Sequence, residues 1–83
     1  MSDLLVEIIS PSGVLFKGNC YMAVIPSTLG DIGVMNGHEV VVVSLREGQI
    51  HLYNDQQHIK KSFDVKGGFA EVQASGKLLA LVD

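Results

Sequence analysis

The sequence is poor in the residues that mark several common classes of protein. It has 83 residues with one cysteine, two prolines, no tryptophan and only 18% charged side chains. A single cysteine excludes an internal disulfide, so nothing in the composition calls for an oxidising compartment. No apolar run approaches the roughly 18 residues that a membrane-spanning helix needs. These absences predict a small cytoplasmic domain without a membrane segment.

The charge pattern excludes two further classes. The first ten residues, M-S-D-L-L-V-E-I-I-S, lack a basic leader and place two acids in an apolar pattern, which argues against a secretory signal. The net charge of −3 is the wrong sign for a protein that follows a phosphate backbone, so we expect no nucleic-acid partner. Any association with a membrane is expected to occur only through a partner protein.

The residues that are abundant indicate β-structure. Apolar residues make up 47% of the chain, nine glycines punctuate it, and no stretch has a sustained helical period. Turn signals recur at intervals of roughly 8–12 residues, which is typical of a sandwich or barrel. We predict an all-β fold of about eight to ten strands in a two-sheet β-sandwich, or flattened barrel. The expected strands cover residues 4–10, 14–17, 20–25, 40–45, 49–53, 59–65, 69–73 and 77–82.

Apolar positions flanked by turn signals predict the core of this sandwich. The apolar share is high for so short a chain, and two interpretations stay open. Either these side chains simply fill the core, or part of the apolar surface is covered by another subunit. The residues predicted to be buried are Val6, Ile8, Phe16, Val24, Val42, Ile50, Phe63, Phe69, Val72 and Leu81.

The side chains that could carry chemistry form no recognisable site. His38, His51 and His58 lack the spacing that places two imidazoles on one metal ion, so we expect no metal. Cys20 lies among apolar residues, where a thiol is usually buried with a raised pKa. The glycine-rich segment 30–38 fits neither phosphate-binding pattern, and no helix follows it. The sequence therefore predicts no catalytic residue and no cofactor.

The order of several short motifs is more specific than any one of them. They are Ser10, Phe16 and Gly18, then G-D-I-G at 30–33, G-H at 37–38, the spacing of Leu45, Gly48 and Ile50, and G-G-F-A-E-V-Q at 67–73. This series covers nearly the whole chain. It resembles the N-terminal domain of the epsilon subunit of F-type ATP synthases, the subunit called delta in mitochondria.

The resemblance implies a β-sandwich without catalytic activity at the foot of the rotating central stalk. Such a subunit binds the gamma subunit and the membrane ring of c subunits, and it supports assembly and the coupling of proton transport to ATP synthesis. Its place would be the cytoplasmic face of a bacterial inner membrane, or an organelle inner membrane. The residues matching the c-ring contact are Thr28, Leu29, Gly30 and Asp31. Those matching the gamma contact are Ser10, His38, Val41 and Val43.

The sequence also departs from this family. Many members continue into an α-helical hairpin that carries inhibition and, in some, ATP binding; we expect neither activity here, because the sequence ends at Asp83. The family often has proline where this chain has Asn36 and Val40, so a less rigid loop and a longer following strand are expected.

Two other functions remain possible from the sequence. A free-standing small-ligand-binding β-barrel would need a convergent polar cluster at its mouth. A lipoyl- or biotin-carrier-like sandwich would need a lysine at an exposed hairpin tip, and the tip at 54–57 is N-D-Q-Q.

Overall fold

The first strand, β1, Leu4–Ser10, is apolar except for Glu7 and Ser10, and it is central to its layer because both of its edges are paired. The side chains of Leu4, Val6 and Ile8 are fully buried on one face. β1 pairs with β2, Gly13–Cys20, in an antiparallel hairpin, and on its other edge it pairs in parallel with β9, Lys77–Val82. The first and last strands therefore lie side by side in the sheet.

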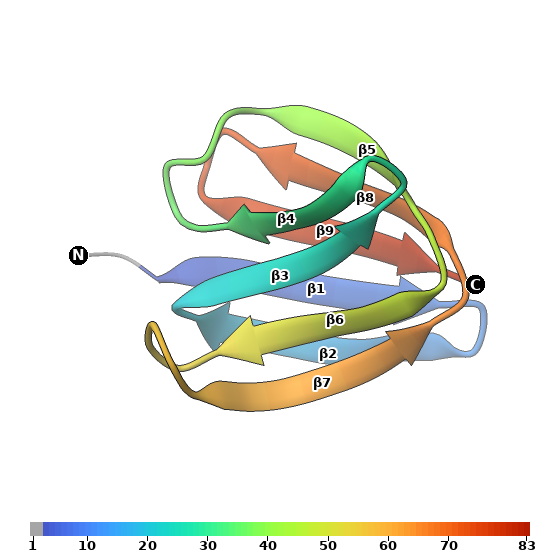
Figure 1. The fold of residues 1–83 in the computed structure, drawn as a ribbon, viewed down its shortest axis with the longest axis horizontal. Helices are drawn as coiled ribbons and strands as arrows, with labels where there is room; N and C mark the ends of the chain where they lie inside the picture. Colours follow the sequence, from blue (N-terminus) through green and yellow to red (C-terminus); the bar gives the residue numbers. More distant parts are fainter. Residues whose placement is uncertain (1–2) are drawn as a thin grey trace.

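The computed structural model describes residues 3–83 and contains nine strands there. They follow the order β2-β1-β9-β8-β5-β3-β6-β7, and β4 pairs with β3. β5 and β3 share only the pair Ser27 and Leu45, so the sheet folds there into two layers (Figure 1). The remaining strands are β3 Met22–Ser27, β4 Gly30–Val34, β5 Val41–Leu45, β6 Gly48–Tyr53, β7 Ile59–Val65 and β8 Gly68–Gln73.

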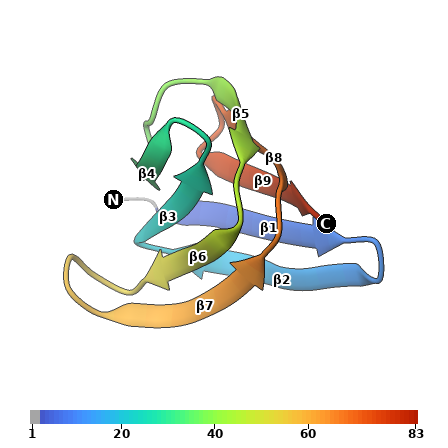
Figure 2. The ribbon, with the colours of Figure 1, turned by 45° about the vertical axis from the view of Figure 1, so that its right-hand side comes forward.

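The two outer strands of this order, β2 and β7, lie at the same side of the molecule (Figures 1 and 2). Side chains bridge the seam between them. The rings of Phe16 and Phe63 have centroids 5.8 Å apart, and Lys60 Nζ donates a hydrogen bond to the Asn19 carbonyl at 3.1 Å. The sheet is thus a nearly closed, flattened barrel, which confirms the predicted all-β sandwich.

The core lies between the two layers, and only part of its predicted membership is correct. Val6, Ile8, Ile50 and Val72 are buried as predicted, whereas Phe16, Val24 and Phe63 are half-buried. The prediction is wrong for Val42, Phe69 and Leu81, whose exposed fractions are 63%, 59% and 49%. The cause is strand register. β8 buries Ala70 and Val72, and β9 buries Ala80 and Val82, so their immediate neighbours point to the other face.

The predicted strands at 4–10, 59–65 and 77–82 match β1, β7 and β9. The expected loop at residues 30–38 instead begins with a strand, because β4 forms a hairpin with β3. Pro26 lies inside β3 rather than closing it, and it faces Asp31 of β4. β5 begins at Val41, one residue later than predicted.

Candidate interaction surfaces

The connections between strands divide the molecule into two ends (Figure 1). The Leu29 end carries the β1–β2, β3–β4, β5–β6 and β7–β8 connections. The His38 end carries the β2–β3, β4–β5, β6–β7 and β8–β9 connections. All four residues predicted to contact a c-ring, positions 28–31, lie in or beside the β3–β4 turn at the Leu29 end. The structure therefore brings this predicted group together.

The β3–β4 turn presents an apolar side chain to solvent. Leu29 is 93% exposed, although its backbone amide donates to Oγ of the fully buried Ser27 at 3.1 Å. The Thr28 amide donates to the Ser44 carbonyl of β5 at 2.9 Å. Gly30 has a φ of +123°, a conformation that favours glycine and lets the chain turn directly into β4. The turn is anchored by its backbone while Leu29 projects outward.

A residue that the sequence did not single out also holds this turn. Arg46 Nη2 lies 2.6 Å from Asp31 Oδ1, and Arg46 Nη1 donates to the Ser27 carbonyl at 2.6 Å. The backbone amide of Arg46 donates to the Pro26 carbonyl at 2.8 Å. The sequence shows only that Arg46 lies between the strands predicted at 40–45 and 49–53. The 15-residue separation from Asp31 offers no local pattern that could have revealed the pair.

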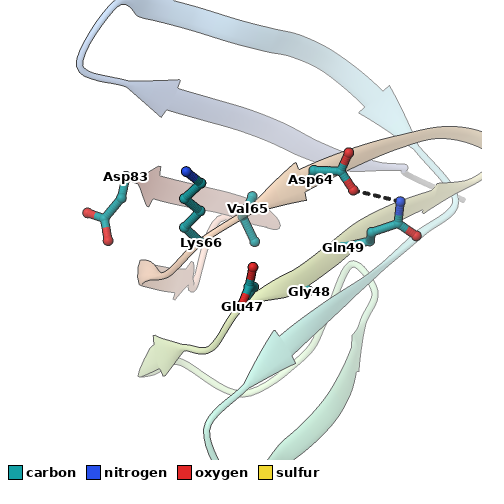
Figure 3. Close-up of a pocket in the computed structure, with 7 residues that line it drawn as sticks. All are labelled: Glu47, Gly48, Gln49, Asp64, Val65, Lys66 and Asp83. Atoms are coloured by element: carbon teal, nitrogen blue, oxygen red, sulfur yellow. Dashed lines mark hydrogen bonds between the residues drawn. The ribbon is translucent and has the colours of Figure 1, made fainter.

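Another part of the Leu29 end carries the carboxylates of Glu47, Asp64 and Asp83 together with one lysine, Lys66. A hollow of about 540 Å³ lies beside the β5–β6 and β7–β8 connections (Figure 3). On its wall, Gln49 Nε2 donates to Asp64 Oδ1 at 2.8 Å. Within residues 3–83, no three His, Cys, Asp or Glu side chains are grouped so that they could hold a metal ion. The hollow is lined by Glu47, Gly48, Gln49, Asp64, Val65, Lys66 and Asp83.

A second surface is apolar and covers the outer side of three adjacent strands. We call it the apolar face; it consists of Val42 on β5, Phe69 on β8, and Leu79 and Leu81 on β9. These four side chains surround a shallow depression of about 180 Å³ together with Ala70 and Glu71. Leu81 lies opposite Phe69 in the β8–β9 ladder. Four large apolar side chains grouped on one face are a typical feature of protein interfaces.

The residues predicted to contact a gamma subunit do not form one cluster. Ser10 closes β1 at the Leu29 end, whereas His38 lies in the β4–β5 loop at the opposite end. The side chains of Val41 and Val43 are half-buried against the core, so β5 offers Val42 to a partner instead. The longest dimension of the molecule is 32 Å. A partner that touches both Ser10 and His38 must therefore extend along most of the sandwich.

Cys20 is buried, and the side chains of His51 and His58 contact neighbouring polar groups. The burial of Cys20 is as predicted, and it raises the pKa of the thiol while the positive charge of Lys60 opposes that rise. His51 Nδ1 lies 2.7 Å from Ser62 Oγ. His58 Nδ1 lies 2.9 Å from both carboxylate oxygens of Asp55 at the β6–β7 tip. No helix within residues 3–83 is long and apolar enough to cross a membrane.

Comparison with known proteins identifies the family of this chain. Residues 3–79 match the family model described as ATP synthase, Delta/Epsilon chain, beta-sandwich domain. The chain belongs to this family. The predicted resemblance is thereby confirmed, and the motif at 67–73 that contributed to it contains Phe69 of the apolar face.

Individual relatives agree with this assignment. The ATP synthase epsilon chain of Parvibaculum lavamentivorans is 43% identical over 70 residues, covering 84% of this chain and 52% of the relative. That of Caulobacter vibrioides is 34% identical over 76 residues, covering 92% of this chain and 86% of the relative. The chain spans about half the length of the Parvibaculum relative and of a second epsilon chain, from Granulibacter bethesdensis.

A solved structure supports the fold independently of sequence identity. A chain from the Euglena gracilis mitochondrial ATP synthase, in a structure of OSCP, F1 and the c-ring, superposes with a TM-score of 0.87 at 19% identity. The match covers 99% of this chain and 51% of the other. Agreement over so much of the chain supports the β-sandwich fold.

Proposed function

We propose that this chain is a non-catalytic subunit in the central stalk of an F-type ATP synthase. It would bind the gamma subunit along the sandwich and rest the Leu29 end on the ring of c subunits. Its role would be to support assembly and to couple proton transport to ATP synthesis. It would lie at the cytoplasmic face of a bacterial inner membrane, or at an organelle inner membrane, and would be attached there only through the complex.

The observation that carries this proposal is the apolar face of a chain in the delta/epsilon family. Phe69 and Leu81 are large and about half exposed, although Ala70, Ala80 and Val82 beside them are buried. Covering such side chains by a partner gains about 25 cal/mol per Å² of apolar surface removed from water. A long helical partner lying across β8 and β9 would obtain that gain and would leave the Leu29 end free.

The alternative of a small-ligand-binding barrel receives less support. The space between the layers is filled by the fully buried side chains of Ile8, Ile25 and Leu52. A ligand in the barrel would have to displace them. The acidic hollow at the Leu29 end lies outside this interior and has no histidine or cysteine in its lining.

The decisive experiment measures binding of purified gamma subunit to the chain and to three variants. Leu81→Ala and Phe69→Ala remove apolar contacts from the apolar face, and each should weaken binding roughly tenfold, since burying the exposed half of such a side chain is worth about 1–1.5 kcal/mol. Ile59→Ala is the matched control. Ile59 is 49% exposed, as Leu81 is, but it lies on β7. Isothermal calorimetry gives the dissociation constants, and thermal melts report folding.

The results separate two ways in which the proposal could fail. If the folded wild-type chain does not bind gamma, the proposed function is wrong. If it binds and all three variants bind equally well, the function stands but the apolar face is not the interface.

A further inference from the structure

At the Leu29 end, the carboxylate of Asp31 is not free but forms an ion pair with Arg46. Asp31 shares its carboxylate with Arg46 at 2.6 Å, and both side chains are exposed, at 62% and 45%. Exposed ion pairs usually contribute about 1 kcal/mol or less to stability. This pair is therefore a poor explanation for the stability of the fold, although its geometry is specific.

The guanidinium of Arg46 is used in two directions at once. One terminal nitrogen binds Asp31, at the start of β4, while the other binds the carbonyl of Ser27, at the end of β3. Arg46 thus spans the two sides of the β3–β4 turn from outside the hairpin. A planar fork with several donors can satisfy both acceptors together, whereas a single ammonium group is a point charge.

The backbone of Arg46 is fixed by the same hairpin, because its amide donates to the Pro26 carbonyl. The side chain and the backbone therefore join the β5–β6 connection to the end of β3. Between the two residues that the guanidinium binds, the chain projects Leu29 almost fully into solvent. The tip of the β3–β4 turn, residues 28–31, therefore presents the apolar side chain of Leu29 beside the carboxylate of Asp31, whose charge is already paired with Arg46.

We propose that Arg46 is a positioning residue that sets the shape and charge of the tip, so that the contact made there depends on Leu29 rather than on a free Asp31 carboxylate. This inference rests on the proposed function, because it takes the c-ring as the partner of the Leu29 end. The inference predicts that the partner has an apolar recess that receives the side chain of Leu29. A cation alone would find Asp31 already paired.

The first arm of the test uses the isolated chain and needs no partner. Amide hydrogen exchange should quicken at Thr28 and Leu29 in Arg46→Gln, by roughly tenfold if about 1.4 kcal/mol of local ordering is lost. Arg46→Lys should give an intermediate rate, because an ammonium group replaces only part of the fork. The amide of Gly76, which donates to the Gln73 carbonyl at the other end, is the internal reference and should not change.

The second arm measures affinity for c-rings in detergent. Leu29→Ala should weaken binding at least tenfold with an unchanged melting temperature, because the side chain touches little of its own fold. Arg46→Gln should weaken it by a similar factor. Glu47→Gln removes a charge from the neighbouring position but leaves the contacts of Arg46 with Asp31 and Ser27 in place. The affinity of this variant for c-rings should stay within twofold of wild type. Affinity for gamma should be the same for all these variants.

Each contrary outcome overturns a stated part of the proposal. Unchanged exchange at Thr28 and Leu29 in Arg46→Gln would show that Arg46 does not position the turn. Full ring affinity in Leu29→Ala, with a loss in Asp31→Asn, would show that the carboxylate carries the contact. A wild-type chain that binds gamma but not c-rings would remove both the ring contact and this inference, while the gamma contact of the proposed function would stand.

Discussion

Replacing Gly68 by alanine should be far more damaging than its small change in volume suggests. Gly68 opens β8 with a φ of +126°, and it pairs with Val82 of β9 and Leu45 of β5. A Cβ atom added there would lie 2.1 Å from the Leu81 carbonyl oxygen and 2.9 Å from the Val82 Cα. Both are backbone atoms, so no flexible side chain can move aside. The β8–β9 ladder would have to open.

The size of this effect can be worked out from two contributions. A side chain forced into a positive φ costs about 1–3 kcal/mol, and overpacking costs a further 1–3 kcal/mol. Together they approach about 4 kcal/mol, whereas a chain of this length is expected to have only about 4–12 kcal/mol of stability. The melting temperature should fall by roughly 15–30 °C. The Gly68→Ala variant is therefore expected to be largely unfolded at temperatures where the wild-type chain is still folded.

Gly30→Ala provides the matched comparison. Gly30 has a nearly identical φ of +123°, but an added Cβ would meet no atom within 4 Å. It should lose only the conformational part, about 2 kcal/mol. Guanidinium unfolding followed by far-ultraviolet circular dichroism measures both variants. Equal losses for the two substitutions would refute the argument that close approach of β9 makes glycine necessary at position 68.

Two further predictions concern titration and reactivity. The carboxylate of Asp55 accepts hydrogen bonds from the Gln57 amide and from His58, and these hold its pKa below the ordinary value of 3.8; a depressed pKa contributes stability above that value that is lost as the pH falls through the folded pKa. Unfolding at pH 7 and pH 2 should therefore show a smaller difference between wild type and Asp55→Ala at the lower pH, and a constant difference would contradict this. The Cys20 thiol, buried and with a raised pKa, should react with an aromatic disulfide reagent at least a hundredfold more slowly in the native chain than in denaturant, so comparable rates would show that the site opens readily.

Much of the strand pattern could be predicted because the local signals were unambiguous. In β1, a largely apolar run is ended by the turn residues Pro11-Ser12-Gly13, and the predicted bounds equal the observed ones. β4 was missed for a physical reason. Its sequence, G-D-I-G-V, contains two glycines and only two apolar residues, so it shows no strand period, and its pairing with β3 is what makes it a strand.

The apolar face could not be predicted, because both faces of its strands carry apolar residues. Residues 41–43 are all valine, and residues 78–82 read L-L-A-L-V, so alternation cannot decide which side chains point inward. Pairing with β8 decides this, since Val43 lies opposite the buried Ala70 and Val42 lies opposite Glu71. The contacts of Arg46 could not be predicted either, because its partners Ser27 and Asp31 belong to the β3–β4 hairpin, which is distant in the sequence.

The parallel pairing of β1 with β9 has a consequence for how the molecule is made. β9 lies between β1 and β8, and its last paired residue is Val82, so these two strands each keep an open edge until residues 77–82 have been synthesised. The β1–β2 hairpin can contact β3 before then, but nothing joins β1 to β8. Contacts between such distant segments fold slowly, and unpaired edges invite association with other chains. On the ribosome, the sandwich should therefore assemble late and in one cooperative step rather than strand by strand.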